Sequence, residues 1–312
     1  MNDVNIRRII KFGNMSVTKD VSVVIVNYNT YQLLEACIKS VIKYTKGVDY
    51  ELIVVDNHSD PELSLKLDRA FPNQAHTILL TENLGFGRAN NEGFKHATGK
   101  YVLCLNPDTL LLNNAIGVLC DYMNHHPAVG ICGGNLYDAD MNPTHSFRMT
   151  LPSFWWELDY HFGYFFSKSL WGKDLEHNTS DKPKSVGYIT GADMMIRKDI
   201  LDITGGFSNH FFMYFEECEL TYRIKKLGYK VFSVPEAKIQ HLEGQSFPSS
   251  ELSTKMKYQI YSQWMYRRLC FPSMFYRLLA LLTKMKVLLS SGKSAILNYH
   301  VDVLAQIEND VK

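Results

Sequence analysis

Four short apolar runs, separated by segments with helix-like spacing, constrain the fold of residues 21–135 more than any other feature of this sequence. The runs are VSVVIVNYN, ELIVVDN, HTILLTEN and KYVLCLNPD, and each has the length of a buried strand. The segment YQLLEACIKSVIKYT places apolar side chains on one side of a helix: Leu34, Cys37, Ile38, Val41 and Ile42. Strands that alternate with helices require crossover connections, so the pattern predicts an α/β fold with a mostly parallel, doubly wound sheet.

The remaining segments add helices and one irregular region. GRANNEGFKHATG predicts a helix that ends at Gly99, because glycine is common just beyond a helix C-terminus. NNAIGVLCDYMNHH predicts a further helix. Residues 145–185 are dense in aromatic side chains without a clean period, and we interpret them as an insertion or a flexible wall over the site. From about residue 250 the chain is predicted to be helical and amphipathic.

Composition argues against several classes of protein. A net charge of +1 over 312 residues disfavours a nucleic-acid binder that relies on bulk electrostatics. The first 20 residues lack the apolar stretch of a signal peptide, and no window has the roughly 18 uncharged apolar residues of a spanning helix. We therefore expect a cytoplasmic protein. Six scattered cysteines without C-x-x-C spacing are expected to be small buried side chains in a reducing compartment: Cys37, Cys104, Cys120, Cys132, Cys218 and Cys270.

Two aspartates follow predicted strands, where open α/β sheets bind their ligands. Asp56 closes ELIVVD, and Asp108 follows YVLCLNP. A carboxylate at a strand end can bind a ribose or a base edge. A carboxylate beside a diphosphate needs a divalent cation between them, which makes Asp108 a candidate metal ligand. The alternative is that each aspartate caps the turn or helix that follows it.

The segment ENLGFGRANNEG is similar to a glycine-rich phosphate loop, although it does not match G-x-G-x-x-G. Gly85 and Gly87 permit close backbone approach, and Arg88 offers a planar fork for a phosphate. Asn90 and Asn91 supply further polar groups. A loop followed by a solvated helix start is the alternative.

Three acids, Glu216, Glu217 and Glu219, follow the apolar segment FFMYF at the start of a predicted helix. Carboxylates in a first turn stabilise the helix, which is one interpretation. An apolar neighbourhood also raises a carboxylate pKa and suits it to general-base catalysis. Glu216 and Glu219 share a helix face, whereas Glu217 projects elsewhere. His241, after the strand-like YKVFSV, is either a structural residue or a second metal ligand.

Taken in order, several segments resemble those of family 2 glycosyltransferases with the GT-A fold, in the rhamnosyltransferase-like branch. They are VSVVIVNYNT, ELIVVDNHSD, NLGFGRANNEG, YVLCLNPDT, GADMMIRKDI, FFMYFEECELTYRIKKLGY and HLEGQS. The resemblance runs from about Val21 to Ser246. It implies a catalytic domain at 21–247, with a nucleotide-sugar-binding half at 21–135 and an acceptor and catalytic half at 136–247. Residues 1–20 and 248–312 are then an N-terminal and a helical C-terminal extension.

The resemblance also implies roles for single residues. Asp108 matches the last acid of the family's Asp-x-Asp motif, which binds the metal (Mg²⁺ or Mn²⁺) that bridges the diphosphate; Asn106 replaces the first acid. His241 matches a histidine implicated in metal binding. Glu217 matches the base that deprotonates the acceptor hydroxyl, with Glu216 beside it, and both remain candidates because Glu replaces the more frequent Asp. The implied donor contacts are Asn27, Tyr28, Asn29, Asp56, Asn57, Asn83, Gly85 and Arg88.

The implied function is inverting transfer of a sugar from a nucleotide diphosphate donor to a glycan or lipid-linked oligosaccharide. By this resemblance the pathway is cell-surface polysaccharide biosynthesis (O-antigen or capsule), and the donor is dTDP-rhamnose, with a UDP-hexose or UDP-galactofuranose as alternatives. The C-terminal extension suits peripheral contact with the inner face of the cytoplasmic membrane. Its packing on the catalytic domain or on the second subunit of a homodimer is the alternative. The side chains concerned are Phe271, Met274, Phe275, Leu278, Leu279, Leu282, Arg277, Lys284 and Lys286.

Other classes fit the sequence less well. A nucleotidyltransferase would show a glycine-rich loop after its first strand, and VSVVIVNYNTYQ contains no glycine. A dinucleotide-dependent oxidoreductase would need G-x-G-x-x-G after a strand. A processive polysaccharide synthase would need spanning helices. A catalytically silent binding subunit of a glycan assembly complex remains an alternative, against which the joint presence of Asp56, Asp108 and Glu217 argues.

Overall fold

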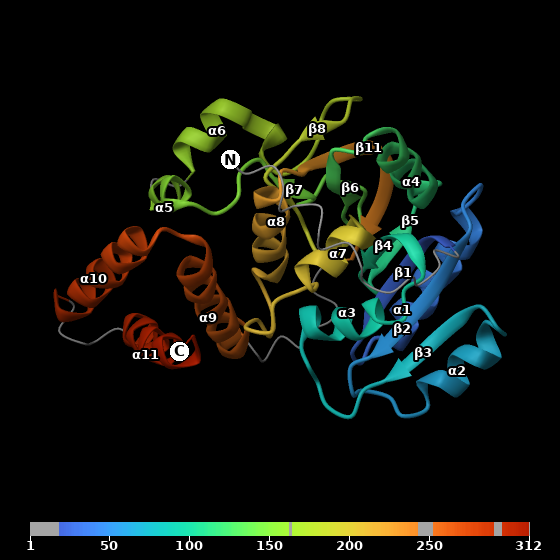
Figure 1. The fold of residues 1–312 in the computed structure, drawn as a ribbon, viewed down its shortest axis with the longest axis horizontal. Coiled ribbons are helices and arrows are strands. Elements are labelled where there is room, and N and C mark those ends of the chain that lie inside the picture. The colour runs from blue at the N-terminus through green and yellow to red at the C-terminus, as the bar shows by residue number, and fades with distance from the viewer. Residues whose placement is uncertain (1–18, 162–163, 243–251, 290–294, 312) are drawn as a thin grey trace, which may run out of the picture.

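The computed structural model describes residues 19–161, 164–242, 252–289 and 295–311, which form a central sheet flanked by helices (Figure 1). The strands are β1 (Lys19–Asn27), β2 (Tyr50–Asp56), β3 (Ala75–Leu79), β4 (Gly99–Leu105), β5 (Thr109–Leu111), β6 (Val129–Tyr137), β7 (Phe147–Arg148), β8 (Lys184–Ser185), β9 (Tyr188–Ile189), β10 (Asp193–Arg197) and β11 (Lys230–His241). The helices are α1 (Tyr31–Tyr44), α2 (Leu63–Ala70), α3 (Phe86–Phe94), α4 (Ala115–His125), α5 (Phe154–His161), α6 (Phe165–Trp171), the 3₁₀ helix η2 (Gly172–Leu175), α7 (Lys198–Thr204), α8 (Glu216–Lys226), α9 (Leu252–Cys270), α10 (Ser273–Leu289) and α11 (Ala295–Asp310).

The main sheet of the described residues has the order β3-β2-β1-β4-β10-β6-β11-β5, with β8 paired to β11. The first four strands in this order are parallel, and β6 and β11 run in the same direction as they do. Only β10, β5 and β8 run antiparallel to their neighbours. The predicted α/β fold with a mostly parallel sheet is therefore confirmed, and the antiparallel β10 joins its two halves.

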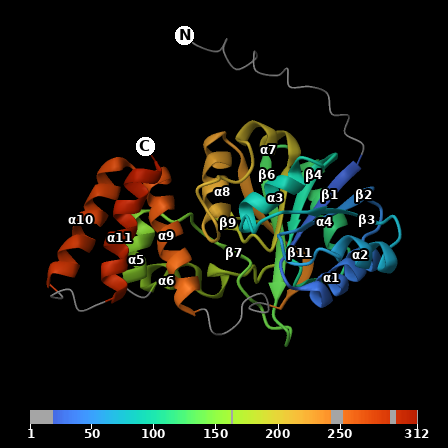
Figure 2. The same ribbon diagram turned by 90° about the horizontal axis from the view of Figure 1, so that it is seen from below.

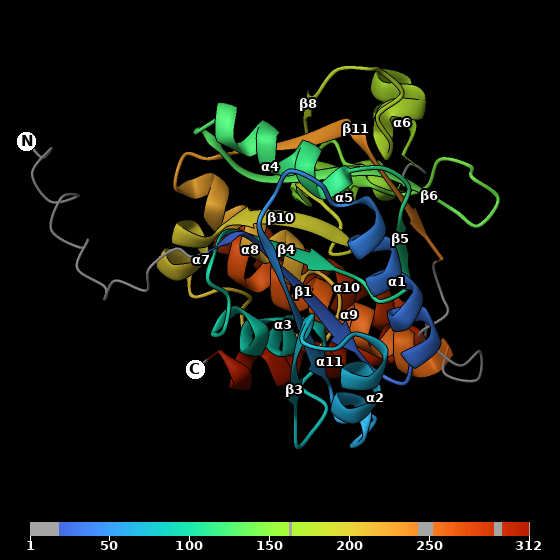
Figure 3. The same ribbon diagram turned by 90° about the vertical axis from the view of Figure 1, so that its right-hand side faces the viewer.

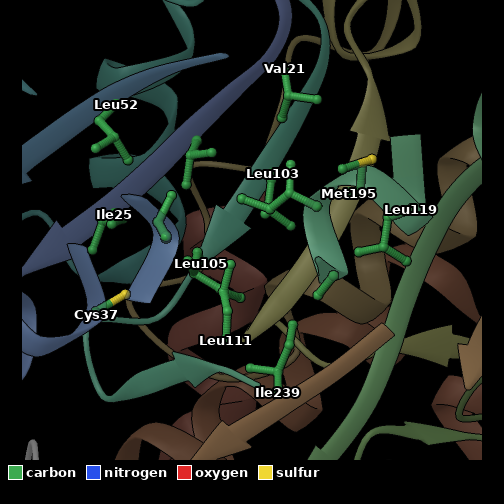
Figure 4. Close-up of a cluster of buried hydrophobic side chains, with 14 of the residues drawn as sticks. Val21, Ile25, Cys37, Leu52, Leu103, Leu105, Leu111, Leu119, Met195 and Ile239 are labelled. Carbon is green, nitrogen blue, oxygen red and sulfur yellow. The ribbon is translucent and has the colours of Figure 1, made fainter. Parts of the chain in front are cut away.

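Both faces of the sheet are covered, as the bare apolar runs predicted. Successive side chains of a strand point to opposite faces. Accordingly, Val23 and Ile25 of β1 belong to a core with α1, α2 and α4 (Figures 3 and 4), whereas Val24 and Val26 belong to a second core with α3, α7 and α8. A strand buried on both sides needs apolar residues at every position, which explains the absence of alternation in VSVVIV.

The C-terminal helices α9, α10 and α11 form a bundle with a core of its own, beside α8 and next to α5 (Figures 1 and 2). Trp264, Met265 and Tyr266 of α9 pack in this core together with Phe211 and Cys218 of the sheet domain. The predicted helical extension is confirmed. Its predicted start at 248, and all but two of the N-terminal residues 1–20, lie outside the described residues.

The aromatic-rich region 145–185 contains the short helices α5 and α6 and forms a wall beside the bundle. A buried ion pair ties this wall to α9: Arg267 donates from Nε and Nη2 to the two carboxylate oxygens of Glu157, at 2.7 Å each. Phe154 of α5 stacks on Phe275 of α10, with ring centroids 4.6 Å apart. The six cysteines are all buried and unpaired, as predicted.

One boundary predicted from sequence is wrong. Helix α3 ends at Phe94, and Gly99 opens strand β4 instead of capping the helix. The backbone N–H of Gly99 donates to Ser22 Oγ on β1 at 2.8 Å, and a Cβ at this position would lie 2.4 Å from the Ser22 nitrogen. The glycine is therefore required by close packing between neighbouring strands.

Candidate active site

A cavity of about 380 Å³ opens where β1, β2 and β4 end and the antiparallel β10 begins. This is the edge of the sheet at which open α/β folds bind their ligands. The residues that line it come from both halves of the sheet, from the segment before α8 and from α9. They are Val26, Tyr28, Thr30, Asn57, Asn83, Phe86, Asn106, Pro107, Asp108, Thr190, Gly191, Ala192, Phe212, Met213, Tyr214, Glu216, Glu217, His241 and Lys255.

The ends of β1 and β2 lie in register, with Asn27 opposite Asp56. The Asp56 carboxylate is buried and accepts four hydrogen bonds: from Asn27 Nδ2, from the Ser59 hydroxyl and backbone N–H, and from the Asp60 N–H. It therefore shapes the turn after β2. Asn27, Asp56 and Asn29, which has a φ of +58°, do not line the cavity, whereas Tyr28 does.

Asn57 and Asn83 line the cavity, and Gly85, which does not line it, is hydrogen-bonded to both side chains. Asn57 Nδ2 donates to Asn83 Oδ1 at 2.8 Å, and the Leu84 N–H donates to Asn57 Oδ1. Gly85 has a φ of +80°, and a Cβ there would lie 2.0 Å from the Phe212 carbonyl oxygen, so glycine is required. The predicted phosphate ligand Arg88 lies away from the cavity lining, with its Nε donating to the Leu84 carbonyl at 2.7 Å.

Asp108 and His241 come together although 133 positions separate them in the chain. The antiparallel pair of β5 and β11 places Thr109 opposite His241, and His241 Nε2 lies 3.3 Å from Asp108 Oδ1. Asn106 Nδ2 lies 3.4 Å from the same ring nitrogen. Asp108 Oδ1 is buried and accepts no hydrogen bond from the described residues.

These side chains could bind a divalent cation whose coordination shell also includes phosphate oxygens. A carboxylate is a suitable ligand for Mg²⁺ or Mn²⁺, and Mg²⁺ commonly uses one or two carboxylates together with phosphate oxygens. The imidazole adds a nitrogen ligand, which favours a transition-metal ion such as Mn²⁺ over Mg²⁺. No cluster of three or more His, Cys, Asp or Glu side chains with metal-ligand geometry occurs among the described residues. The protein alone thus supplies an incomplete coordination shell, which substrate oxygens would complete.

The start of α8 positions the two candidate bases. Tyr214 and Phe215, directly before the helix, both adopt left-handed backbone conformations, with φ of +71° and +65°. Non-glycine residues rarely adopt this conformation, and its strain is typical of functional sites. The third acid of the motif, Glu219, forms a bidentate pair with Arg223 and has a structural role.

Glu216 and Glu217 both line the cavity, and burial raises the pKa of each. Burial raises the pKa of Glu217 to about 7. The pKa of Glu216 rises well above its usual range, first because of burial and then because of the neighbouring charge of Glu217. Glu216 is only 4% exposed, and its Oε2 has no hydrogen-bond partner among the described residues. A pKa of about 7 would allow Glu217 to act as a base near neutral pH.

A second cavity, of about 720 Å³, lies between α8, the wall at 145–157 and the C-terminal helices. Thr190, Tyr214 and Glu217 line both cavities. Glu216 lines only the smaller one. The boundary between the two spaces thus contains one carboxylate, that of Glu217.

Sequence reasoning missed three parts of the smaller cavity. Thr190–Ala192 precede β10, and they reach the site because the Asn106 N–H donates to the Ala192 carbonyl at 2.9 Å. Phe212–Tyr214 reach it because the Phe86 N–H donates to the Phe212 carbonyl at 3.0 Å. Lys255 comes from α9, and no local pattern in the sequence predicts its position.

A family model and two relatives in sequence all describe the transfer of sugars. A family model described as "Glycosyl transferase family 2" matches residues 22–203, which is more than half of the chain. N-acetylglucosaminyl-diphospho-decaprenol L-rhamnosyltransferase of Mycobacterium tuberculosis is 24% identical over 256 residues, covering 77% of this chain and 83% of the relative. The low-salt glycan biosynthesis hexosyltransferase Agl10 of Haloferax volcanii is 27% identical over 261 residues, covering 82% of this chain and 76% of the relative.

Two solved structures share the fold. GalNAc-T7 with UDP, GalNAc and Mn²⁺ aligns with a TM-score of 0.58 and 17% identity, over 80% of this chain and 48% of that one. The mannosyltransferase PcManGT of Pyrobaculum calidifontis, in complex with GDP-Man and Mn²⁺, aligns with a TM-score of 0.54 and 16% identity, over 93% of this chain and 75% of that one. They confirm the predicted GT-A fold. The family model, which matches more than half of the chain, shows that this chain belongs to glycosyl transferase family 2 and is a glycosyltransferase.

Proposed function

We propose that this enzyme transfers a sugar from a nucleotide diphosphate donor to an acceptor hydroxyl, with inversion at the anomeric carbon. The observation that carries the proposal is the position of Glu217, which lines both cavities. A donor in the smaller cavity and an acceptor in the larger one would meet at this carboxylate. A general base must lie within reach of the proton that it removes, and Glu217 meets this condition better than Glu216.

The donor diphosphate is proposed to lie between Asp108 and Lys255. Lys255 is the only Lys or Arg among the described residues of the smaller cavity, and its charge would offset part of the diphosphate charge. Asp108 and His241, with Asn106 beside them, would hold a divalent cation, as the Mn²⁺ in both structural relatives supports. When bound, that cation would stabilise the negative charge of the leaving diphosphate.

The proposed reaction is a single displacement. The acceptor oxygen forms a bond to the anomeric carbon from the face opposite the diphosphate, while the bond from that carbon to the phosphate oxygen breaks. The hydroxyl proton passes to Glu217, and the bonding electron pair leaves with the nucleotide diphosphate. Attack from the opposite face inverts the configuration. The raised pKa of Glu217 makes its carboxylate a stronger base than an exposed glutamate.

A deoxysugar or hexose donor and a glycan acceptor fit the relatives best. We propose rhamnose from dTDP-rhamnose, with a lipid-linked acceptor in cell-surface polysaccharide synthesis, because one relative is an L-rhamnosyltransferase that acts on a diphospho-decaprenol acceptor. The hexosyltransferase relative favours a hexose donor as the alternative. A UDP-linked hexose or galactofuranose is the specific form of this alternative.

A panel of nucleotide sugars tests the proposed function. Purified protein is mixed with each donor, with and without Mg²⁺ or Mn²⁺, and thermal shift and nucleotide diphosphate release are measured. We expect nucleotide sugars of one nucleotide class to stabilise the protein and to be hydrolysed slowly. The Lys255→Ala variant is expected to need a higher donor concentration to reach half of the maximal thermal shift. Well-folded protein that responds to no donor or free diphosphate would contradict the proposal and favour a binding subunit.

The pH dependence of transfer follows from the raised pKa of Glu217. The base is active when deprotonated, so kcat/KM is expected to rise with pH, about tenfold per unit below 7, and to level off above it. Initial rates between pH 5.5 and 8.5, at saturating metal, measure the profile. A rate that does not change with pH over this interval would mean that a carboxyl with an ordinary pKa, or no carboxyl, acts as the base.

We also propose that the outer face of α10 contacts a membrane surface. Phe271, just before this helix, and Tyr276 within it are buried in the bundle core, so only part of the apolar segment faces outward. No helix of the described residues is long and apolar enough to span a membrane. Helix α10 contains basic residues and no acidic ones, which suits contact with an anionic membrane surface. Its outward apolar side chains are Met274, Leu278, Leu281, Leu282, Met285, Leu288 and Leu289.

Vesicle sedimentation tests this contact. The wild-type protein is expected to pellet with vesicles that contain anionic lipid, and the variant with Leu281→Glu and Leu288→Glu is expected to stay in the supernatant. Both leucines are more than half exposed, so the variant should fold. Equal sedimentation of the two proteins would show that α10 is not the contact.

A further inference from the structure

The larger cavity is built mostly by residues outside the part of the chain that the family model matches. That model ends at residue 203, whereas most of the cavity lining comes from α8 to α11. At about 720 Å³ it lies within the usual range for small-molecule sites. It shares Glu217 with the donor cavity, so a ligand that fills it has one end at the proposed base.

Away from Glu217, the described residues inside this cavity carry almost no net charge. Arg267 and Glu157 neutralise each other through their two hydrogen bonds, and Arg267 also lies over the Trp264 ring, 4.4 Å from its centroid. Burial lowers the pKa of His145 to about 4 and also lowers that of His300, so both rings are neutral at neutral pH. Such an interior suits an uncharged part of a ligand.

Several lining groups are available for hydroxyl groups. Gln259 and Gln263 make no side-chain hydrogen bond with the described residues, and each amide offers both donors and an acceptor. Trp264 Nε1 donates to His300 Nδ1 at 2.9 Å, which leaves Nε2 as the protonated nitrogen of the neutral ring. Next to these groups are apolar side chains such as Ile260 and Leu279. Polar groups set among apolar walls match a sugar, which has hydroxyls and apolar ring faces.

One exposed cation, in contrast, lines this cavity. Lys286 on α10 lines the cavity, is exposed, and forms no ion pair with the described residues. Arg267 is the only other Lys or Arg among the described residues that line it, and Glu157 neutralises it. An anionic group of the ligand would therefore bind at Lys286. The exposed apolar side chains of Leu282 and Met285 lie next to it in the sequence of α10.

We infer that the larger cavity is the acceptor site and that it takes a glycan attached through a phosphate or diphosphate to an alkyl chain. The sugar would lie at Gln259, Gln263 and Glu217, the phosphate at Lys286, and the chain on the outer face of α10. This inference rests on the proposed function, since it takes Glu217 as the base. It makes the C-terminal helices part of the active site.

Binding of two matched probes tests the inference. The probes are decyl diphosphate N-acetylglucosamine and the decyl glycoside of the same sugar without the diphosphate, both below their micelle concentration. Titration calorimetry with wild-type protein, saturated with the nucleotide diphosphate, measures each Kd. We expect the diphosphate probe to bind about tenfold more tightly, which corresponds to one charge-assisted contact.

Two pairs of variants locate the binding. Lys286→Ala is expected to raise the Kd of the diphosphate probe about tenfold. Lys284→Ala should stay within about twofold, because Lys284 is exposed on the same helix but does not line the cavity. Gln263→Phe fills the cavity and should raise the Kd of both probes at least about tenfold. Gln306→Phe, on the exposed side of α11, should leave both Kd values unchanged. Melting temperatures of all four variants confirm that they are folded.

The inference would be overturned if Lys286→Ala and Lys284→Ala weakened binding of the diphosphate probe equally, or if Gln263→Phe left the binding of both probes unchanged. It would also be overturned if the diphosphate probe did not bind to wild-type protein. Complete displacement of the diphosphate probe by inorganic diphosphate alone would indicate a simple anion site and would also overturn the inference. These results are separable from failure of the proposed function. Protein that binds no nucleotide sugar contradicts the function itself, whereas protein that binds one and yet gives any of these outcomes contradicts only the acceptor site.

Discussion

Glu217→Gln is expected to reduce the rate of sugar transfer by about 10²- to 10⁴-fold, the usual cost of losing a general base. The amide keeps the shape of the side chain at the boundary of the two cavities, but it cannot take the acceptor proton. Donor binding should change little, because the donor contacts are proposed to lie at Asp108 and Lys255. Single-turnover transfer, together with donor Kd, measures both effects.

The stability of this variant separates a catalytic loss from unfolding. Burial raises the pKa of Glu217 above its unfolded value, so the folded state binds a proton more tightly, and this group destabilises the fold as pH rises through about 7. Glutamine removes that penalty, and the variant should melt at or above the wild-type temperature at pH 8. Glu216→Gln is the matched comparison. If it loses more activity than Glu217→Gln, the assignment of the base is reversed.

Asp108→Asn is expected to raise the metal concentration for half-maximal activity by about 10- to 100-fold. The substitution keeps the size of the side chain and removes the carboxylate whose Oδ1 lies buried beside His241. Activity is measured while Mn²⁺ or Mg²⁺ is titrated after chelator treatment. His241→Ala should shift the titration in the same direction by a smaller factor, because a carboxylate contributes charge as well as a ligand atom.

Asn106→Asp provides a test in the opposite direction. It introduces a second carboxylate 2 positions before Asp108 and close to the His241 ring, where Asn106 Nδ2 lies 3.4 Å from Nε2. The half-maximal metal concentration should fall. Wild-type activity that survives exhaustive chelation, with no response to Asp108→Asn or Asn106→Asp, would show that Lys255 and other cations neutralise the diphosphate without a metal ion.

The sheet and the position of the site at its carboxyl edge were predictable from the sequence, because both depend on local patterns. The run VSVVIV is apolar at every position except Ser22, since residues such as Val23 and Val24 enter separate cores on opposite faces. Asp108, Asn57 and Asn83 follow strands or open loops at that edge, and all three line the cavity. Glu216 and Glu217 were predicted as the two candidate bases, and both line the cavity.

The rest depends on contacts between distant segments. Asp56 was predicted to be a donor contact, and its carboxylate accepts three hydrogen bonds from the turn that follows it and one from Asn27 on β1. Arg88 looked like a phosphate ligand, but the neighbouring Leu84 carbonyl holds its guanidinium. Gly99 resembled a helix cap, and the deciding contact is with Ser22 on another strand. Lys255 and the larger cavity require α9 to pack on α8, which no local pattern specifies.

The configuration of the transferred sugar tests the central claim most directly. Once the donor panel has identified the substrate, the anomeric configuration of the first product is determined by NMR and compared with that of the donor. A single displacement assisted by Glu217 predicts the opposite configuration in the product and almost no product from Glu217→Gln with donor bound. A product with the donor's configuration would contradict the account, because retention requires a second displacement or a different geometry of attack.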